Sequence, residues 1–470
     1  MQQNTNAKTV SRRAFLKSMV IGLALVAAAP IAQACAPAAP APTQAPAAEP
    51  TKAAEPTQAP AAATMVPEPT KAPAASSGAK TPVRLVVMDY DDRMAKDTQA
   101  VIDAFNQSQD KIEAKVDVVS WNDGYTVLTT QVSGLQAPDL ANVSAGWLLT
   151  FAAAGEVEPL ESYVEPDFLT NFVPAALEHM KVEGKLMALP YFEDSRGIYY
   201  RTDLFEKAGL KPPTTWDEMR EVAKKLHNPP DVYGIGLGPG DYWWYAWIGA
   251  VGGEGNQSPW GPDKCLIVDG EAGVAACQHL VDLALVDKTT QPSPVKADRD
   301  KDLQPLFMAG KLAMLETGPW FHIILGKDAP DIKFDVAPLA VAKPGMKSGN
   351  VAWPDAVCLF KQSKDKGAAA ELMKFMFSKE NRLAFTKQRG NPPERLDVGA
   401  DPSFGTNKFE KFFFEQTKVA FNVYQSPWPA DYVKDFTEVQ NAYSAAILGE
   451  MKAAEAMKKA ADTVNKSHGL

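Results

Sequence analysis

The sequence predicts an α/β protein with two domains after residue 80, and three observations support this prediction. The run 83–88 (VRLVVM) predicts a buried strand, a helix follows to about Asn106, and alternating apolar residues at 111–119 predict a second strand. Such a β-α-β start is typical of α/β sheets, in which ligands bind beyond the carboxyl ends of the strands. The 390 residues after residue 80 exceed what one hydrophobic core usually holds.

Residues 1–34 resemble a signal for export. The pair Arg12 and Arg13 precedes Phe15, Leu16 and Lys17, and an apolar run follows at 19–29. This arrangement resembles a twin-arginine signal, which exports proteins that have already folded. The apolar run is about half of the roughly 20 residues that cross a bilayer, so we do not expect a transmembrane helix there.

Cleavage is expected between Ala34 and Cys35, and two kinds of peptidase fit that bond. Ala32 and Ala34 supply the small-x-small pattern of ordinary signal peptidase. Ala34 before Cys35 also fits a lipobox, although Ala32 stands where a lipobox usually has leucine. The segment 36–80 favours lipidation, because its ten prolines and lack of aromatic residues are typical of an extended spacer. A spacer directly after a cysteine suits a lipid anchor at Cys35.

The expected mature protein is acidic. Residues 1–34 contain four basic and no acidic residues, so their removal takes the formal charge from −9 to −13. An acidic surface disfavours nucleic acid as a partner. We expect an exported protein at the outer face of the cytoplasmic membrane or in the periplasm, anchored there through Cys35.

The segment 241–247 (DYWWYAW) is the densest aromatic stretch of the chain. Five of its seven residues are aromatic, whereas the whole chain is 9% aromatic. Tyrosine and tryptophan carry polar groups that need partners when buried, so such a run suits a wall that stacks on a sugar ring. It also suits a domain core at the start of a helix. We expect at least half of these five rings in the core and one or two against a ligand.

The segment 215–218 (TWDE) predicts the N-terminus of a structural helix. Thr215 and Glu218 have the spacing of a capping box, in which each side chain bonds the other residue's backbone amide. Trp216 and the apolar residues that follow it at helical spacing predict a buried face without a chemical role. Later patterns predict helices at 303–309 and 367–377, apolar strand segments at 312–315 and 357–360, and a long helical stretch at 432–466.

Three separated motifs resemble those of bacterial extracellular solute-binding proteins of the maltose-binding type. They are 204–210 (LFEKAGL) with prolines at 212–213 and the capping box, 307–314 (FMAGKLAM) with 318–320 (GPW), and 138–139 (PD) with Gly155 and 159–160 (PL). The resemblance covers essentially all of 82–470. It implies a two-lobed periplasmic-binding-protein fold of type II, with a ligand cleft between lobes joined by hinge crossings. It also implies that a solute is delivered to the membrane permease of an ABC importer.

The resemblance implies a division of the chain into a signal and a linker followed by two discontinuous lobes. The expected parts are a signal peptide at 1–34, the anchor Cys35 with a disordered linker at 35–80, an N-terminal lobe at 81–192 plus 336–397, and a C-terminal lobe at 193–335 plus 398–470. Hinges are expected near 193–196 and 333–337, where solute binding closes the lobes. We expect a monomer.

The resemblance also implies ligand-binding residues, position by position. The expected contacts are Tyr90, Asp92, Arg93, Trp147, Asp194, Asp241, Tyr242, Trp320 and Trp353. Asp194 matches a hydroxyl-binding carboxylate beside a hinge, and Tyr242 and Trp320 match aromatic sugar platforms. The sequence departs from the family pattern at 141–147, where only Trp147 lies close to the expected aromatic, and at Gly240, where a carboxylate is expected and Asp241 follows. The class of solute, a carbohydrate, therefore transfers better than its identity.

Two other functions fit parts of the sequence. A glycoside hydrolase needs paired carboxylates, and Asp92, Asp194 and Asp241 can in principle pair, but no spacing marks an acid and a nucleophile. A binding protein for another solute, such as a metal ion or a polyol phosphate, is the second alternative. The adjacent Tyr199 and Tyr200 are similar to tyrosines of ferric-ion-binding relatives, yet their segment predicts a packed strand. The five histidines lack ligand spacing, so we expect no metal. The sequence has no nucleophile elbow, phosphate loop or dinucleotide fingerprint, so we expect no cofactor and no enzymatic activity.

Three cysteines follow Cys35. Cys265 and Cys277 lie twelve residues apart, and their spacing allows either a disulfide or two free thiols. Cys358 lies in an apolar strand segment and predicts a small buried side chain.

Overall fold

The predicted β-α-β start supplies two strands of a five-stranded sheet. Its strands are β1 (Thr81–Asp89), β2 (Ile112–Ser120), β3 (Leu140–Ser144), β6 (Ala188–Phe192) and β11 (Asp355–Leu359), in the order β2-β1-β3-β11-β6. Strand β1 runs parallel to β2 and β3, and β11 runs antiparallel to β3 and β6. The helix α2 (Arg93–Ser108) connects β1 to β2, as the sequence predicts.

The structure is a computed structural model that describes residues 80–89, 93–238, 242–253, 258–261, 263, 265–352, 354–422 and 432–470. The predicted signal peptide, Cys35 and the linker lie outside the described residues. Residues 80–470 form one compact unit, whose start agrees with the strand predicted near residue 81. None of the described helices combines the length and the apolarity that crossing a bilayer requires.

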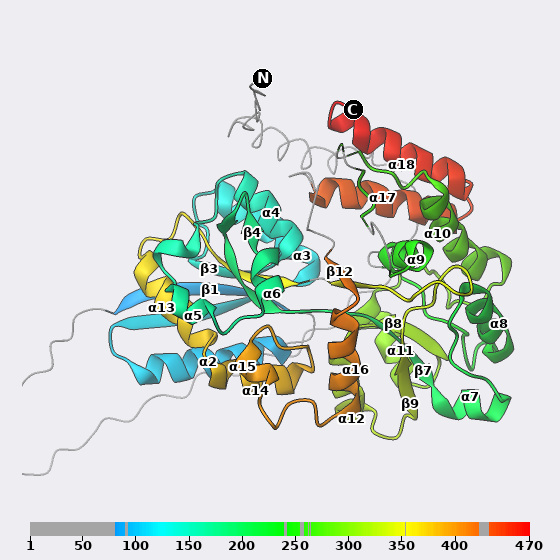
Figure 1. Ribbon diagram of the computed structural model, residues 1–470, viewed down its shortest axis with the longest axis horizontal. Helices are drawn as coiled ribbons and strands as arrows, with labels where there is room; N and C mark the ends of the chain where they lie inside the picture. Colours follow the sequence, from blue (N-terminus) through cyan, green and yellow to red (C-terminus); the bar gives the residue numbers. More distant parts are fainter. Residues whose placement is uncertain are drawn as a thin grey trace, which may run out of the picture. The chain divides into compact units, whose positions relative to one another are not determined.

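Helices cover both faces of the five-stranded sheet, and the sheet with these helices is called the N-terminal lobe. Figure 1 shows α2 on one side, with α3 (Trp121–Ser133) and α4 (Ala145–Ala153) on the other. This coverage explains the unbroken apolar run 85–88 of β1, since a parallel strand is buried on both faces. The remaining elements of this lobe are η1 (Leu160–Ser162), α5 (Pro166–Leu169), α6 (Pro174–His179), β4 (Lys181–Val182), β5 (Lys185–Leu186), α13 (Lys366–Met376), α14 (Lys379–Arg389) and α15 (Leu396–Gly399).

A second sheet has three antiparallel strands in the order β8-β7-β9, and with its helices it is called the C-terminal lobe. The strands are β7 (Gly197–Arg201), β8 (Met314–Thr317) and β9 (Phe334–Ala337). The helices of this part are α7 (Thr202–Ala208), α8 (Trp216–Leu226), α9 (Tyr242–Val251), α10 (Glu271–Val281), α11 (Gln304–Met308) and α12 (Trp320–Asp328). The π-helical turns η2 (Asp282–Val286) and η3 (Arg299–Leu303) extend α10 and precede α11.

The chain passes from the first sheet to the second through 193–196, where the first hinge is expected. The second hinge was expected near 333–337, but those residues include β9, which pairs with β7. The predicted lobe boundary between residues 335 and 336 therefore lies inside a strand. The chain leaves the second sheet after Ala337 and reaches β11 at Asp355, passing through β10 (Asn350–Ala352), which pairs with β12 (Ala420–Asn422).

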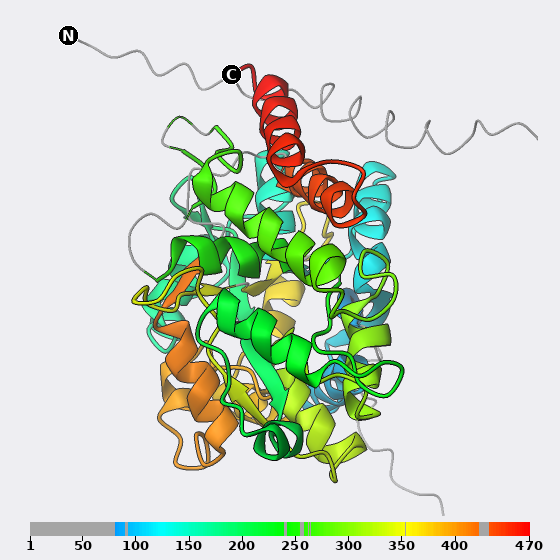
Figure 2. The same cartoon turned by 90° about the vertical axis from the view of Figure 1, so that its right-hand side faces the viewer.

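The long helical stretch predicted at 432–466 is two helices, α17 (Tyr432–Ile447) and α18 (Ala453–Ser467). Gly449 between them has a φ of 76°, a left-handed conformation that ends a right-handed helix. Because the chain turns at Gly449, helix α18 packs against α17 and α10, as Figure 2 shows. Helix α17 also contacts α4 of the N-terminal lobe. The helix α16 (Lys408–Thr417) contacts β10.

Three local predictions are confirmed. The capping box of α8 is complete, since Thr215 accepts from the amide of Glu218 and the Glu218 carboxylate accepts from the amide of Thr215. Trp216 on this helix is buried and stacks on His279 with ring centroids 4.4 Å apart. Tyr199 is buried in β7 and donates its hydroxyl to the carbonyl of Gly318, so it packs as predicted.

Candidate functional site

A cavity of about 510 Å³ is lined by residues from both sheets and from the segment that joins them. Asp89, Trp121 and Ser144 lie at or directly after the carboxyl ends of β1, β2 and β3. This is the edge of an α/β sheet at which ligands usually bind. The volume is also typical of a small-molecule site, which ranges from about 300 to 1,000 Å³.

The N-terminal lobe contributes a wall of two tryptophans. The rings of Trp121 and Trp147 lie 5.3 Å apart between centroids and are tilted by 53°. Ser144 caps α4 and accepts from the amide of Trp147, which fixes the start of that helix. Gly124 lies against this wall, and a Cβ atom there would come within 3.0 Å of the Trp147 ring. Both tryptophans are half-buried, so part of each ring faces the cavity.

The C-terminal lobe contributes Trp320, the first residue of α12. Its ring lies over Gly318 so closely that any side chain at Gly318 would overlap it. The guanidinium carbons of Arg196 and Arg299 lie 5.1 Å and 4.9 Å from the Trp320 ring centroid. A guanidinium within about 6 Å of an indole ring is attracted by its π electrons, so both contacts hold the ring in place. Arg299 also pairs with Asp300 at 3.0 Å.

The crossing segment places a buried ion pair in the cavity wall. Asp194 pairs with Arg196, and both side chains are almost fully buried. The Arg196 Nε donates to the Tyr245 hydroxyl at 2.6 Å, and the Arg196 amide donates to the Asn350 side chain at 2.9 Å. A buried ion pair with further hydrogen bonds is costly to break, because either charge alone would be left unpaired. The pair therefore fixes the geometry of this wall.

A further carboxyl group, Asp355, and a further arginine, Arg389, also line the cavity. Asp355, at the start of β11, accepts from the Asn142 side chain at 3.4 Å. Burial raises the pKa of Asp355 well above its ordinary value, and the nearby Asp194 charge raises it further. Arg389, the last residue of α14, also lines the cavity. Its Nε is buried without a hydrogen-bond partner among the described residues.

Comparison with known proteins identifies the family. The family model for bacterial extracellular solute-binding proteins matches residues 91–383. A binding protein of Brucella abortus (strain 2308) is 31% identical over 323 residues, which cover 66% of this chain and 75% of the relative. The chain belongs to the bacterial extracellular solute-binding proteins.

Two further likenesses bear on this solute-binding protein. A maltotriose-binding protein of Pyrococcus abyssi is 31% identical over 224 residues, covering 47% of this chain and 45% of the relative. The solved structure of an ABC transporter solute-binding protein of Thermotoga lettingae, bound with α-D-tagatose, has a TM-score of 0.74 at 24% identity. The structural match covers 82% of this chain and 99% of the Thermotoga lettingae protein. The structural likeness confirms the two-lobed periplasmic-binding-protein fold that the motifs predict.

The structure brings three of the nine predicted contacts together in the cavity of this solute-binding protein: Trp147, Asp194 and Trp320. The predicted contacts Tyr90, Asp92, Asp241 and Trp353 lie outside the described residues, and Arg93 begins α2 with a side chain that is not described.

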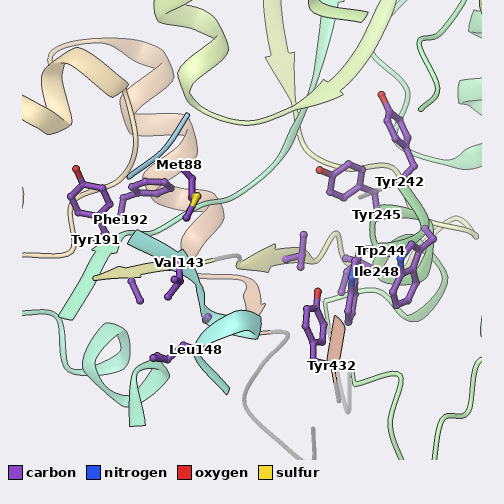
Figure 3. Close-up of a cluster of buried hydrophobic side chains, with 14 of the residues drawn as sticks. Met88, Val143, Leu148, Tyr191, Phe192, Tyr242, Trp244, Tyr245, Ile248 and Tyr432 are labelled. Atoms are coloured by element: carbon purple, nitrogen blue, oxygen red, sulfur yellow. The ribbon is translucent and has the colours of Figure 1, made fainter. Parts of the chain in front are cut away.

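Tyr242 does not line this cavity, and neither does any other ring of the 242–247 run. Figure 3 shows Tyr242 and Tyr245 on α9 beside Trp244, within a buried cluster. All five rings are at most 4% exposed. The expectation that one or two of them face a ligand is therefore not met in this cavity. Tyr245 reaches the site only through its hydrogen bond with Arg196.

Sequence reasoning missed several residues that line the cavity. Trp121 directly follows β2, so the strand-end rule that singled out residues after β1 also pointed to it. Phe436 of α17 lines the cavity, and its ring centroid lies 5.5 Å from that of Trp243. Its spacing along the helix is equally typical of a core residue. Arg299 and Arg389 carry no local signal, because each lies in an ordinary polar stretch.

The cysteine alternatives are resolved. Cys265 and Cys277 are free thiols, so the possible disulfide does not form. Cys277 is buried in α10, where burial raises its pKa to about 12. Such a thiol is rarely ionised and is a poor partner for disulfide exchange. Cys358 is free and buried in β11, as predicted.

Proposed function

We propose that this protein captures a carbohydrate in the interlobe cavity and delivers it to the permease of an ABC importer. The observation that carries the proposal is a pair of aromatic walls, Trp121 with Trp147 on one lobe and Trp320 on the other, around a cavity with buried charged groups. Sugar rings present apolar C–H faces to aromatic rings and hydroxyl groups to polar side chains. The name of the maltotriose-binding relative and the tagatose bound in the similar solved structure support the same class of ligand.

The arrangement supports binding rather than bond cleavage. Hydrolysis of a glycosidic bond uses one protonated and one ionised carboxyl group on opposite sides of the bond. In the cavity Asp194 is paired with Arg196, and Asp300 is paired with Arg299. Asp355, whose pKa is raised, accepts a hydrogen bond from Asn142, and Asp89 accepts one from the amide of Ala95. Each of these four carboxyl groups therefore has a partner in the protein. We therefore propose no enzymatic activity. Incubation with oligosaccharides should yield no new reducing ends, and their appearance would contradict this part of the proposal.

A thermal-shift screen against mono- and oligosaccharides tests the carbohydrate proposal. A ligand that binds only the folded state stabilises that state, by about 2.7 kcal/mol at a hundredfold excess over Kd. This stabilisation raises the melting temperature. Positive sugars should then be titrated by calorimetry against the Trp147→Ala and Trp320→Ala variants, with Trp216→Ala as a control outside the cavity. The proposal fails if no carbohydrate shifts the melting temperature while another solute class does.

Ligand contacts to both lobes are expected to close them about the crossing segments. Small-angle scattering should show a smaller radius of gyration with bound sugar. An unchanged radius at saturation would contradict closure and would leave sugar binding itself intact.

We also propose that the protein acts as a monomer outside the cytoplasm, held at the membrane by a lipid on Cys35. The short signal-like segment at 1–34 and the proline-rich spacer at 36–80 support this. The Cys35→Ala variant should still be cleaved and should appear in the medium. If that variant stays with the membrane fraction like the wild type, the anchor is elsewhere.

A further inference from the structure

Most charged groups of the cavity have a partner in the protein. Asp194 pairs with Arg196, and Asp300 pairs with Arg299. These two pairs contribute no net charge to the cavity. A sugar hydroxyl can bond them, but they do not require a charged ligand.

The other two carboxyl groups at the described cavity surface are also engaged. Asp89 accepts from the backbone amide of Ala95 at 2.8 Å. Asp355 accepts from Asn142, and its burial favours the protonated form. The charge of Arg389 lowers the pKa of Asp355, but burial raises that pKa by more, so Asp355 offsets the charge of Arg389 only in part.

Arg389 differs from all of these. Its guanidinium lines the cavity, yet it forms no ion pair with a described residue, and its buried Nε has no hydrogen-bond partner among them. Gly390 ends α14 directly after it, so Arg389 lies at the partly negative end of a helix. That interaction does not neutralise the guanidinium charge. The Nε itself is covered by protein, so a ligand would reach Arg389 through the part of its side chain that lines the cavity.

We propose that the bound carbohydrate is acidic, a sugar acid or a uronate-containing oligosaccharide whose carboxylate pairs with Arg389. This inference rests on the proposed function and narrows its ligand class. The planar guanidinium fork matches a carboxylate with two parallel hydrogen bonds. Lys301 of η3 adds a second positive charge at the cavity surface, from the C-terminal lobe. The tryptophan walls take the faces of the sugar ring, and the cations take its acid group.

Calorimetry with galacturonate, digalacturonate and trigalacturonate tests this inference. The methyl esters of the same compounds keep the size and remove the charge, and glucose 6-phosphate supplies a tetrahedral anion. The acids should bind more tightly than their esters. The Arg389→Gln variant should weaken binding of the acids by roughly ten- to a hundredfold, since a hydrogen bond to a charged group contributes about 1.5–3 kcal/mol. The esters should bind the variant and the wild type alike.

Two further variants separate charge from geometry. Arg389→Lys keeps the charge but loses the fork, so it should restore only part of the affinity for the acids. Lys387→Gln removes one positive charge from an exposed position of the same helix and should leave acid binding unchanged. Melting temperatures without ligand report whether each variant is folded.

The possible outcomes distinguish this inference from the proposed function. If neutral sugars bind and neither the acids nor Arg389→Gln shows a charge preference, the acidic ligand is excluded and the carbohydrate proposal stands. A preference for the phosphate over every carboxylate also overturns the inference. If no sugar binds, whether acidic or neutral, both proposals fail together.

Discussion

Helix α9 and the start of helix α12 present aromatic residues after similar glycine–proline sequences, yet only the second lines the cavity. Gly238-Pro239-Gly240 shortly precedes Tyr242 in the sequence, and Gly318-Pro319 precedes Trp320. The rings of α9 are buried among α10, β10 and α17, whereas Trp320 is half-buried and lines the cavity. The difference is in what covers each segment.

The comparison shows that a high density of aromatic residues marks the core in this protein. The tryptophans that face the cavity are isolated in sequence and follow strands at their carboxyl ends, as Trp121 and Trp320 do. The aromatic run supports the site from behind, because Trp243 contacts Phe436, which lines the cavity. Variants of the two regions should therefore differ in whether they lose stability or binding.

The largest effect is expected in the core. Trp244→Ala removes a fully buried ring that stacks on Trp243 at 4.3 Å between centroids. Such a truncation costs about 3–5 kcal/mol of folding free energy, because the cavity collapses only in part. Urea unfolding should show this loss, and any protein that remains folded should bind its solute normally. A loss below about 1 kcal/mol would place the ring outside the core.

Trp320→Ala should produce the opposite pattern. Removing a ring that contacts the ligand costs roughly 2 kcal/mol of binding free energy, which is about a thirtyfold loss of affinity. The melting temperature without ligand should stay near that of the wild type, because the ring is only half-buried. Calorimetry and thermal unfolding on the same variant measure both quantities. If Trp320→Ala binds every solute as the wild type does, this ring is not a sugar platform.

Gly318→Ala tests how Trp320 is held. The added methyl group would overlap the Trp320 ring, so the ring must move. We expect weaker binding and a stability loss of about 1–3 kcal/mol from overpacking. In the Trp320→Ala background the same change should cost little, and a double-mutant cycle measures this coupling. Gly326→Ala is the matched control, since nothing lies within 4 Å of a Cβ atom there. Additive effects at Gly318 and Trp320 would contradict the contact.

A pH-dependent effect connects the two regions through β8. Glu316 lies on this strand beside Tyr242 and Tyr245, and burial raises its pKa to about 8. The folded state therefore binds a proton that the unfolded state, with a pKa near 4.5, releases earlier. Stability should fall as pH rises from about 4.5 to about 8, by at most about 1.4 kcal/mol per pH unit.

Glu316→Gln should remove that dependence. The variant should resemble the wild type near pH 4.5 and be more stable than the wild type near pH 8. Urea unfolding at a series of pH values measures the difference. Equal slopes in both proteins would show that Glu316 does not titrate between these values.

Several elements were predictable because their signals are local. The strand β1, the helix α2 and the strand β2 follow from consecutive residues, and the capping box of α8 follows from four residues. Trp320 could be placed at the site because its turn directly follows a strand. The division of 432–466 into two helices was also local, since Gly449 marks the break, but the apolar periodicity on both sides obscured it.

By itself the sequence determined the fold class, the family and three cavity residues, Trp147, Asp194 and Trp320. Only the tertiary structure decided which rings are buried, because the elements that cover α9 come from residues 271–281 and 432–447. Likewise Arg196 is hydrogen-bonded to Tyr245, which is 49 residues away in the sequence, and Asp355 is hydrogen-bonded to Asn142, which is 213 residues away. Local conformation depends on neighbouring residues, whereas burial and charge pairing depend on elements that are distant in the chain. That is why the sequence alone identified a binding cleft but not the charge of the ligand it is proposed to bind.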